Sequence, residues 1–107
     1  MASLYWFSRV LRTSSFDKSI ASHRGSLHGT LIMHGYENMR INDMEIAGGK
    51  EGCWISIGHF FISQVPPHIG SSGQYWEIVM CACDGNDLNK ARTIAAEVAT
   101  LSKRINP

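Results

Sequence analysis

Apolar residues are concentrated in one stretch near the middle of the chain, from Gly52 to Asp84. An apolar run at Cys53–Val65 is followed by a segment rich in Pro, Gly and Ser at 66–73, and a second apolar run occupies 74–83. Two runs rich in β-branched and aromatic residues, separated by turn-forming residues, are typical of paired strands. The pattern therefore predicts one long β-hairpin.

The two faces of this hairpin follow from its register. If the turn is symmetric, Val65 pairs with Gln74, and directly paired side chains share a face. This register predicts a core face that contains His59 and a second face that contains Glu77, so the two side chains lie on opposite sides of the sheet. The second face has the mixed composition of an interface or a shallow binding site. Its predicted ligand or dimer contacts are Trp54, Phe60, Ile62, Tyr75 and Val79.

The first segment of the chain has the composition of a strand. Residues 3–12 are rich in aromatic and β-branched side chains, although some apolar positions in the run also fit helical spacing. We favour the strand, in which Leu4 and Trp6 face one side of the sheet while Tyr5 and Phe7 face the other.

A helix is expected to begin near Ser15, where hydroxyl side chains can cap its N-terminus and Asp17 suits the helix dipole. Gly25 and Gly29 oppose a long helix, because each costs about 1 kcal/mol relative to Ala in a helix interior. We predict that the helix continues through 25–35, with a strand from Leu27 as the alternative. The inward positions of the long helix are Phe16, Ile20, His23, Leu27 and Leu31.

Three further features complete the predicted elements. The alternation of apolar residues over 38–47 slips by one position at Asn42, which fits a bulge or a tight turn in a single strand segment. Residues 48–52 contain three glycines and are expected to form a loop. The last segment predicts a helix, with Lys103 and Arg104 in its final turn. Its inward positions are Leu88, Ala91, Ile94, Ala95, Val98, Leu101 and Ile105.

The order of these elements is strand, helix, three strands, helix. It predicts a single α+β domain over residues 1–107, built as a two-layer sandwich with an antiparallel-rich sheet and both helices on one face. The general build resembles ferredoxin-like α+β domains, although the element order differs and no motif indicates a family. Helices on one side leave the other side of the sheet open, and the apolar second face of the hairpin therefore predicts a homodimer.

Composition narrows the possible functions. The chain has 107 residues, 44% hydrophobic and 18% charged, with a net charge of +1. A near-neutral chain lacks the basic surface on which nucleic-acid binding depends. No apolar run approaches the ~20 residues that span a bilayer, and Arg9 and Arg12 interrupt the only apolar run that could serve as a signal peptide. Three cysteines without a framework spacing favour reduced thiols and a cytoplasmic location.

Few residues suggest chemistry. Cys81 and Cys83 lie about 6.6 Å apart along one strand, which is poor geometry for a mutual disulfide, and no second cysteine pair completes a zinc site. The other candidates are His59 in mid-strand and Glu77. We therefore expect no metal and no cofactor.

Two functional hypotheses remain. The first is a non-catalytic domain that self-associates or binds a small apolar ligand. The alternative is a small dimeric enzyme that uses His59, with Glu77 or Cys81 nearby, in a pocket between sheet and helices. The predicted register separates His59 from Glu77 and so favours the first hypothesis.

Overall fold

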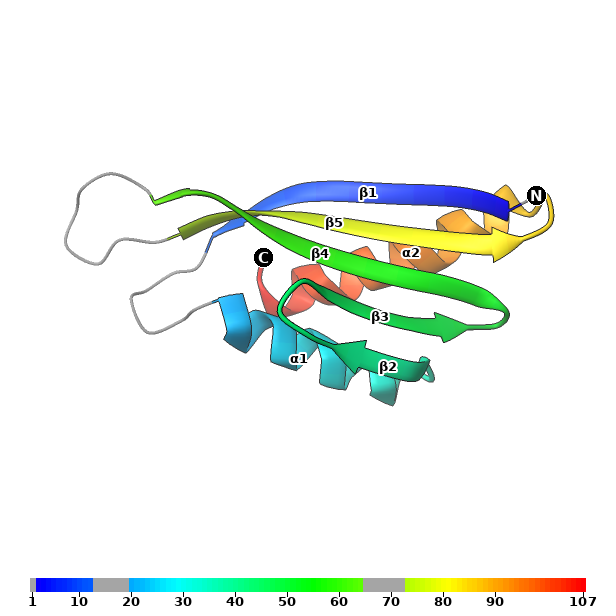
Figure 1. The fold of residues 1–107 in the computed structure, drawn as a ribbon, viewed down its shortest axis with the longest axis horizontal. Coiled ribbons are helices and arrows are strands. Elements are labelled where there is room, and N and C mark those ends of the chain that lie inside the picture. The colour runs from blue at the N-terminus through cyan, green and yellow to red at the C-terminus, as the bar shows by residue number, and fades with distance from the viewer. Residues whose placement is uncertain (1, 13–19, 65–72) are drawn as a thin grey trace.

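The computed structural model describes residues 2–12, 20–64 and 73–107. These residues form one antiparallel sheet of five strands in the order β1-β5-β4-β3-β2, with both helices on one of its faces (Figure 1). The predicted α+β class and the placement of both helices are therefore confirmed, with one more strand than expected. The elements are β1 (Ala2–Arg12), α1 (Ile20–Met33), β2 (Glu37–Ile41), β3 (Glu45–Lys50), β4 (Cys53–Gln64), β5 (Gly73–Asp84) and α2 (Leu88–Ile105).

The additional strand arises at the predicted slip in the alternation. The side-chain oxygen of Asn42 accepts hydrogen bonds from the backbone N–H groups of Met44 (2.8 Å) and Glu45 (2.9 Å), which closes a tight turn between β2 and β3. The prediction of a loop over 48–52 is wrong, because β3 continues to Lys50. The turn to β4 consists of Glu51 (φ 52°) and Gly52 (φ 79°), the left-handed pair that a two-residue hairpin turn requires.

Helix α1 passes through Gly25 and Gly29, so the long helix is confirmed over the described residues and the strand alternative is wrong. The expected start near Ser15 lies outside the described residues. Leu27 and Leu31 are fully buried because they continue the predicted inward stripe. Between sheet and helices they meet the rest of the core, which includes Ile46, Ile55, Ile57, Val79, Ala91, Ala95, Val98 and Leu101.

The register of the central hairpin differs from the symmetric one. His59 pairs with Glu77, three positions away from the expected partner, and a bulge follows Phe61. Because side chains alternate along a strand, an odd shift exchanges the two faces of β5 relative to β4. Tyr75 and Val79 therefore lie on the covered face, which corrects their assignment to the predicted dimer face. This register buries the aliphatic side chains of Ile55, Ile57 and Val79 under the helices.

Candidate functional site

Glu77 lies in the middle of β5 with its side chain 1% exposed beneath the helices. Its partners in the two flanking strands are Arg9 of β1 and His59 of β4, so the three residues form one row across the sheet. Arg9 Nε donates to one carboxylate oxygen at 3.0 Å, and His59 Nε2 donates to the other at 2.7 Å. The prediction that His59 and Glu77 lie on opposite faces of the sheet is therefore wrong.

Both helices contribute to the same carboxylate. His23 of α1 places its Nε2 at 3.0 Å from Glu77 Oε2, and the hydroxyl of Ser102 on α2 lies 2.7 Å from each carboxylate oxygen. The guanidinium of Arg9 also donates to Ser102 Oγ (3.0 Å) and to the carbonyl oxygen of Asn106 (2.7 Å). The Glu77 cluster, comprising Arg9, His23, His59, Glu77 and Ser102, therefore ties three strands to both helices.

The electrostatics of the Glu77 cluster favour an ionised carboxylate. Burial by itself raises the pKa of the Glu77 carboxyl, but hydrogen bonds from His23, His59, Ser102 and Arg9 outweigh it and hold the pKa well below its usual range. The Arg9 guanidinium supplies the compensating charge that a buried carboxylate needs. The cluster is a neutralised ion pair with hydrogen-bond donors on both oxygens.

This lowered pKa predicts loss of stability in acid. Glu77 stays ionised in the folded chain, whereas in the unfolded chain it takes up a proton near its ordinary pKa of about 4.3. Its contribution is therefore present above that pH and is lost below it, by up to about 1.4 kcal/mol of unfolding free energy per pH unit. Urea unfolding between pH 6 and pH 3 measures the slope. A flat profile below pH 5 would contradict the prediction.

The chemistry of the Glu77 cluster does not favour a bound metal ion. The Nε2 atoms of His23 and His59 and a Glu77 oxygen lie within 4.8 Å of one another. However, coordination through both Nε2 atoms would put hydrogens on the Nδ1 atoms, and these buried atoms have no partner among the described residues. A divalent cation would also add two charges beside a carboxylate that Arg9 already neutralises. The arrangement fits hydrogen bonding to Glu77 instead.

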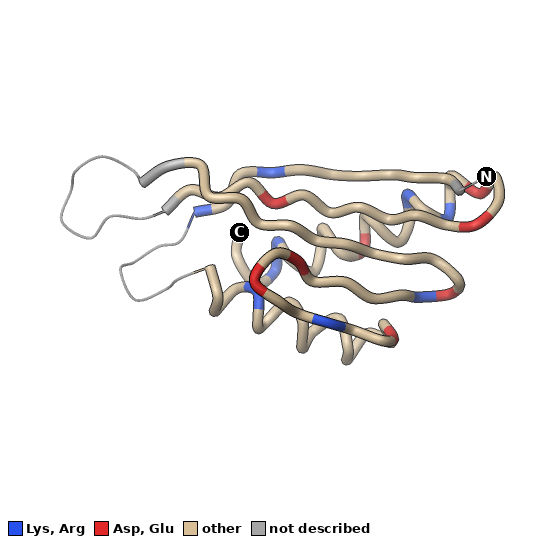
Figure 2. The backbone as a smooth tube through the Cα atoms, viewed as in Figure 1, with Lys and Arg blue, Asp and Glu red and all other residues tan. Residues whose placement is uncertain are grey.

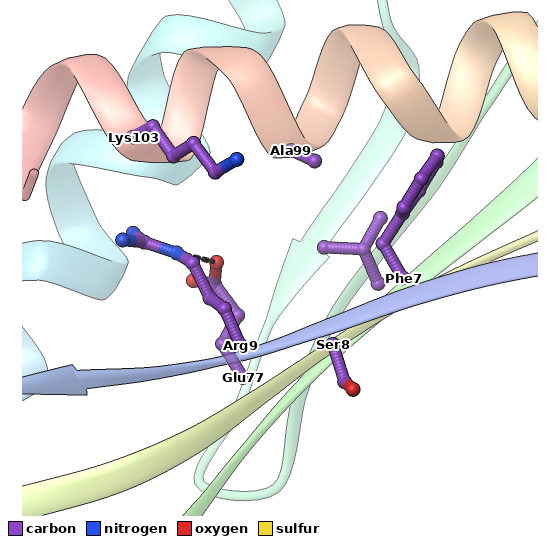
Figure 3. Close-up of a pocket in the computed structure, with 7 residues that line it drawn as sticks. Phe7, Ser8, Arg9, Glu77, Ala99 and Lys103 are labelled. Carbon is purple, nitrogen blue, oxygen red and sulfur yellow. Dashed lines mark hydrogen bonds and ion pairs between the residues drawn. The ribbon is translucent and has the colours of Figure 1, made fainter.

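A small cavity of about 70 Å³ opens beside this cluster, between β1 and α2. Figure 3 shows the side chain of Arg9 crossing in front of Glu77 and that of Lys103 reaching toward the same space from the helix. The volume suffices for only a few water molecules. The lining residues are Phe7, Ser8, Arg9, Glu77, Val79, Ala99 and Lys103.

Sequence reasoning found two members of the Glu77 cluster and missed three. His59 and Glu77 were both candidates, and the structure brings them together. His23 was expected among the inward positions of the long helix, where it lies, but no polar role was predicted for it. Arg9 and Ser102 gave no local signal, because their roles depend on packing between distant segments.

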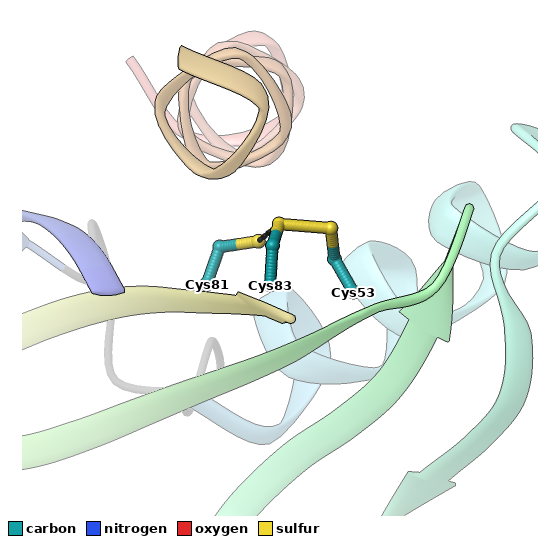
Figure 4. A group of neighbouring side chains, drawn as sticks. All are labelled: Cys53, Cys81 and Cys83. Atoms are coloured by element: carbon teal, nitrogen blue, oxygen red, sulfur yellow. Dashed lines mark hydrogen bonds between the residues drawn. A yellow bond between two sulfur atoms is a disulfide. The ribbon is translucent and has the colours of Figure 1, made fainter. Parts of the chain in front are cut away.

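The cysteines form a second buried group at the end of the sheet. Cys53 and Cys83 lie directly opposite each other in β4 and β5 and form a disulfide, so the expectation of reduced thiols is wrong for this pair. The third candidate, Cys81, is a free thiol whose sulfur lies 3.9 Å from Cys83 Sγ, and burial raises the pKa of the Cys81 thiol. Figure 4 shows all three sulfurs between the sheet and α2. The predicted cytoplasmic location remains a prediction.

The face of the sheet opposite the helices forms an apolar surface, which we call the open face. All three tryptophans of the chain lie on it, with Trp6 and Trp54 58% exposed and Trp76 48% exposed. Of the predicted dimer contacts, Trp54, Phe60 and Ile62 belong to it. Its cross-strand rows are Leu4–Ala82–Trp54, Trp6–Met80–Ser56, Ser8–Ile78–Gly58 and Val10–Trp76–Phe60.

Together, the fold and its sites define a small α+β domain with a buried polar cluster, a buried group of cysteines and an uncovered apolar sheet face. Comparisons with protein-family models, with curated proteins and with solved structures gave no match. The likeness to ferredoxin-like domains therefore stays a prediction. In the described part of the chain, no helix is both long and apolar enough to cross a membrane.

Proposed function

We propose that this protein is a non-catalytic domain that forms a homodimer by packing its open face against the same face of a second copy. The observation that carries the proposal is the exposure of all three tryptophans on a face that neither α1 nor α2 covers. Contiguous exposed apolar surface of this kind marks interaction sites in proteins that otherwise keep such residues buried.

The four cross-strand rows of the open face contain no charged residue, which favours a second copy as the partner. Glu45 of β3 borders these rows and accepts a hydrogen bond from Ser56. Within these rows' span of the three longest strands, the charged residues are Arg9 and Glu77, whose side chains bond to Ser102 of α2 on the covered side of the sheet. Figure 2 shows where the charged residues lie along the chain. Rows without charge offer no ion pair to a charged partner, whereas two such surfaces related by a two-fold axis cover each other.

The dimensions of the open face suit a dimer. Strands of 11 and 12 residues extend for about 40 Å, and three neighbouring strands are about 14 Å wide, which gives roughly 600 Å² in projection. Corrugated side chains enlarge this area toward the ~800 Å² per partner of a standard interface. A hollow of about 300 Å³ beside Gly58, next to the large side chains of Phe60 and Met80, could receive a side chain of the second copy.

The enzyme hypothesis has less support. The His59 side chain is 1% exposed and its Nε2 is engaged by Glu77, so neither ring nitrogen is presented to a substrate. Cys81 is buried away from both residues in the second group. In the small-ligand hypothesis, the binding site is the hollow beside Gly58 on the open face.

Sedimentation velocity tests the dimer directly. We expect a mass of twice 11.9 kDa at micromolar concentration, and a blue shift of tryptophan emission as concentration rises and the three indoles leave water. Trp76→Glu should weaken association by about 100-fold or more, because two buried carboxylates would meet across the interface.

The matched control is Leu88→Glu at the start of α2, where the side chain is as exposed as Trp76 but lies away from the open face. This variant should remain dimeric. A monomeric wild-type protein, or a Trp76→Glu variant that associates as tightly as wild type, would defeat the proposal. A monomer whose tryptophan emission shifts on addition of a small apolar compound would support the ligand-binding hypothesis in its place.

A further inference from the structure

We propose that the three cysteines form a redox-controlled site for a thiophilic cation, Zn²⁺, in the reduced protein. The whole cysteine content of the chain gathers at this point, although Cys53 lies thirty residues from its disulfide partner. The sulfur atoms of Cys53, Cys81 and Cys83 lie within 4.8 Å of one another, and each side chain is buried. Packing alone would not require a third thiol beside a disulfide.

The geometry of the sulfurs fits a tetrahedral ion. Zinc–sulfur bonds of about 2.3 Å separate tetrahedral ligands by about 3.8 Å. Cys81 Sγ and Cys83 Sγ are already 3.9 Å apart. Cys53 faces Cys83 across the strand pair, so its sulfur reaches the third position once the disulfide opens. The fourth position carries no ligand from the described residues and suits water, as in zinc sites that keep one position open.

Charge favours a divalent ion. Three thiolates and one Zn²⁺ leave a single negative charge, and the Lys90 ammonium lies close enough to Cys81 to interact with that charge. Soft thiolate ligands also select zinc over the hard cations Mg²⁺ and Ca²⁺. Thus this group suits a metal ion, unlike the Glu77 cluster, whose carboxylate is already neutralised.

The site lies where it can open. Cys53 is the first residue of β4, directly after the two-residue turn, and Cys83 is the next-to-last residue of β5. Strand ends separate at much lower free-energy cost than strand centres. A reductant and an ion can therefore reach the sulfurs by local opening of this end of the sheet.

The chemistry has two balanced steps. A dithiol reductant transfers two electrons and two protons to the Cys53–Cys83 disulfide, which gives two thiols and leaves the reductant as a disulfide. Binding of Zn²⁺ by the three thiols then releases three protons. Because the disulfide consumes two of the three ligands, the oxidised protein cannot form this site.

Cobalt titration of the wild-type protein tests the site. After reduction and removal of the reductant without oxygen, we expect one equivalent of Co²⁺ to give thiolate-to-cobalt charge-transfer absorption, and Zn²⁺ to displace it. The oxidised protein should show no such absorption. Equal binding by oxidised and reduced protein would overturn the proposal and point to the histidines of the Glu77 cluster.

The variant Cys81→Ser isolates the third ligand, because it leaves the disulfide pair intact. We expect its affinity for Zn²⁺ in the reduced state to fall by about 100-fold or more, since the loss of a ligand exceeds the effect of losing its supporting shell. Zn²⁺ should raise the urea midpoint of the reduced wild-type protein but not that of the variant. His34→Gln, which removes an exposed histidine, is the control and should bind as wild type does. Affinity of Cys81→Ser within a few-fold of wild type would refute the site.

Discussion

Replacement of Glu77 by Gln is expected to lower the free energy of unfolding by about 3–5 kcal/mol, the usual cost of breaking a buried ion pair from one side. The substitution keeps the size of the side chain but leaves the Arg9 guanidinium without its counter-ion. It also presents an amide NH₂ group to the donors of His23 and His59. For a domain of 107 residues this loss is a large part of a total stability of about 5–15 kcal/mol.

Urea unfolding of Glu77→Gln and of the matched variant Glu97→Gln measures this effect. Glu97 also forms an ion pair, with Lys50 at 2.9 Å, but the side chain of Glu97 is 42% exposed. Exposed ion pairs contribute about 0–1 kcal/mol, so Glu97→Gln should change stability little. Equal effects of the two substitutions would show that the Glu77 cluster is not the tie between sheet and helices.

The charge of Arg9 provides a further check on the same cluster. If the unpaired guanidinium causes most of the loss, the double variant Arg9→Met/Glu77→Gln should be more stable than the sum of the two single effects predicts, by about 1–3 kcal/mol. The four variants form a double-mutant cycle. A coupling energy near zero would mean that the two side chains act independently.

Reduction of the Cys53–Cys83 disulfide is expected to lower the free energy of unfolding by about 3–4 kcal/mol in the absence of metal. The bond closes a loop of thirty residues, and the loss of chain entropy in the unfolded state accounts for this magnitude. The comparison is urea unfolding with and without a phosphine reductant. The double variant Cys53→Ala/Cys83→Ala should match the reduced wild type and should not respond to the reductant.

Cys81→Ser serves as the internal control, since it removes a buried thiol but leaves the bond. Its stability should still fall on reduction by the same amount as in wild type. An unchanged urea midpoint after complete reduction, verified by thiol titration, would contradict the assigned role of the bond. This result would not bear on zinc binding, which depends on the reduced thiols.

The two groups show where sequence reasoning reached its limit. His59 and Glu77 both drew notice as rare polar residues in apolar strands, but the assumed turn placed them on opposite faces. A three-residue shift of the pairing exchanged the faces of β5 and produced both the Glu77 cluster and the Cys53–Cys83 bond. The same shift moved Tyr75 and Val79 out of the open face. The register between β4 and β5 therefore determined which of their residues belong to each site.

The sequence by itself determined the local elements. The period-two pattern in the first strand, the apolar stripes of the two helices and the turn residue Asn42 all act within a few residues, so composition and spacing reveal them. They were sufficient to predict an α+β domain with its helices on one side and an apolar sheet face on the other.

The tertiary structure alone decided which distant residues meet. Strand register depends on the summed burial of side chains along both strands and against the helices. A shift by an odd number of residues exchanges the side chains that face the helices with those that face away. The union of Arg9, His23, Glu77 and Ser102 required four segments far apart in the chain, and no local pattern encodes it. The same holds for the three cysteines, whose spacing along the chain concealed their convergence in space.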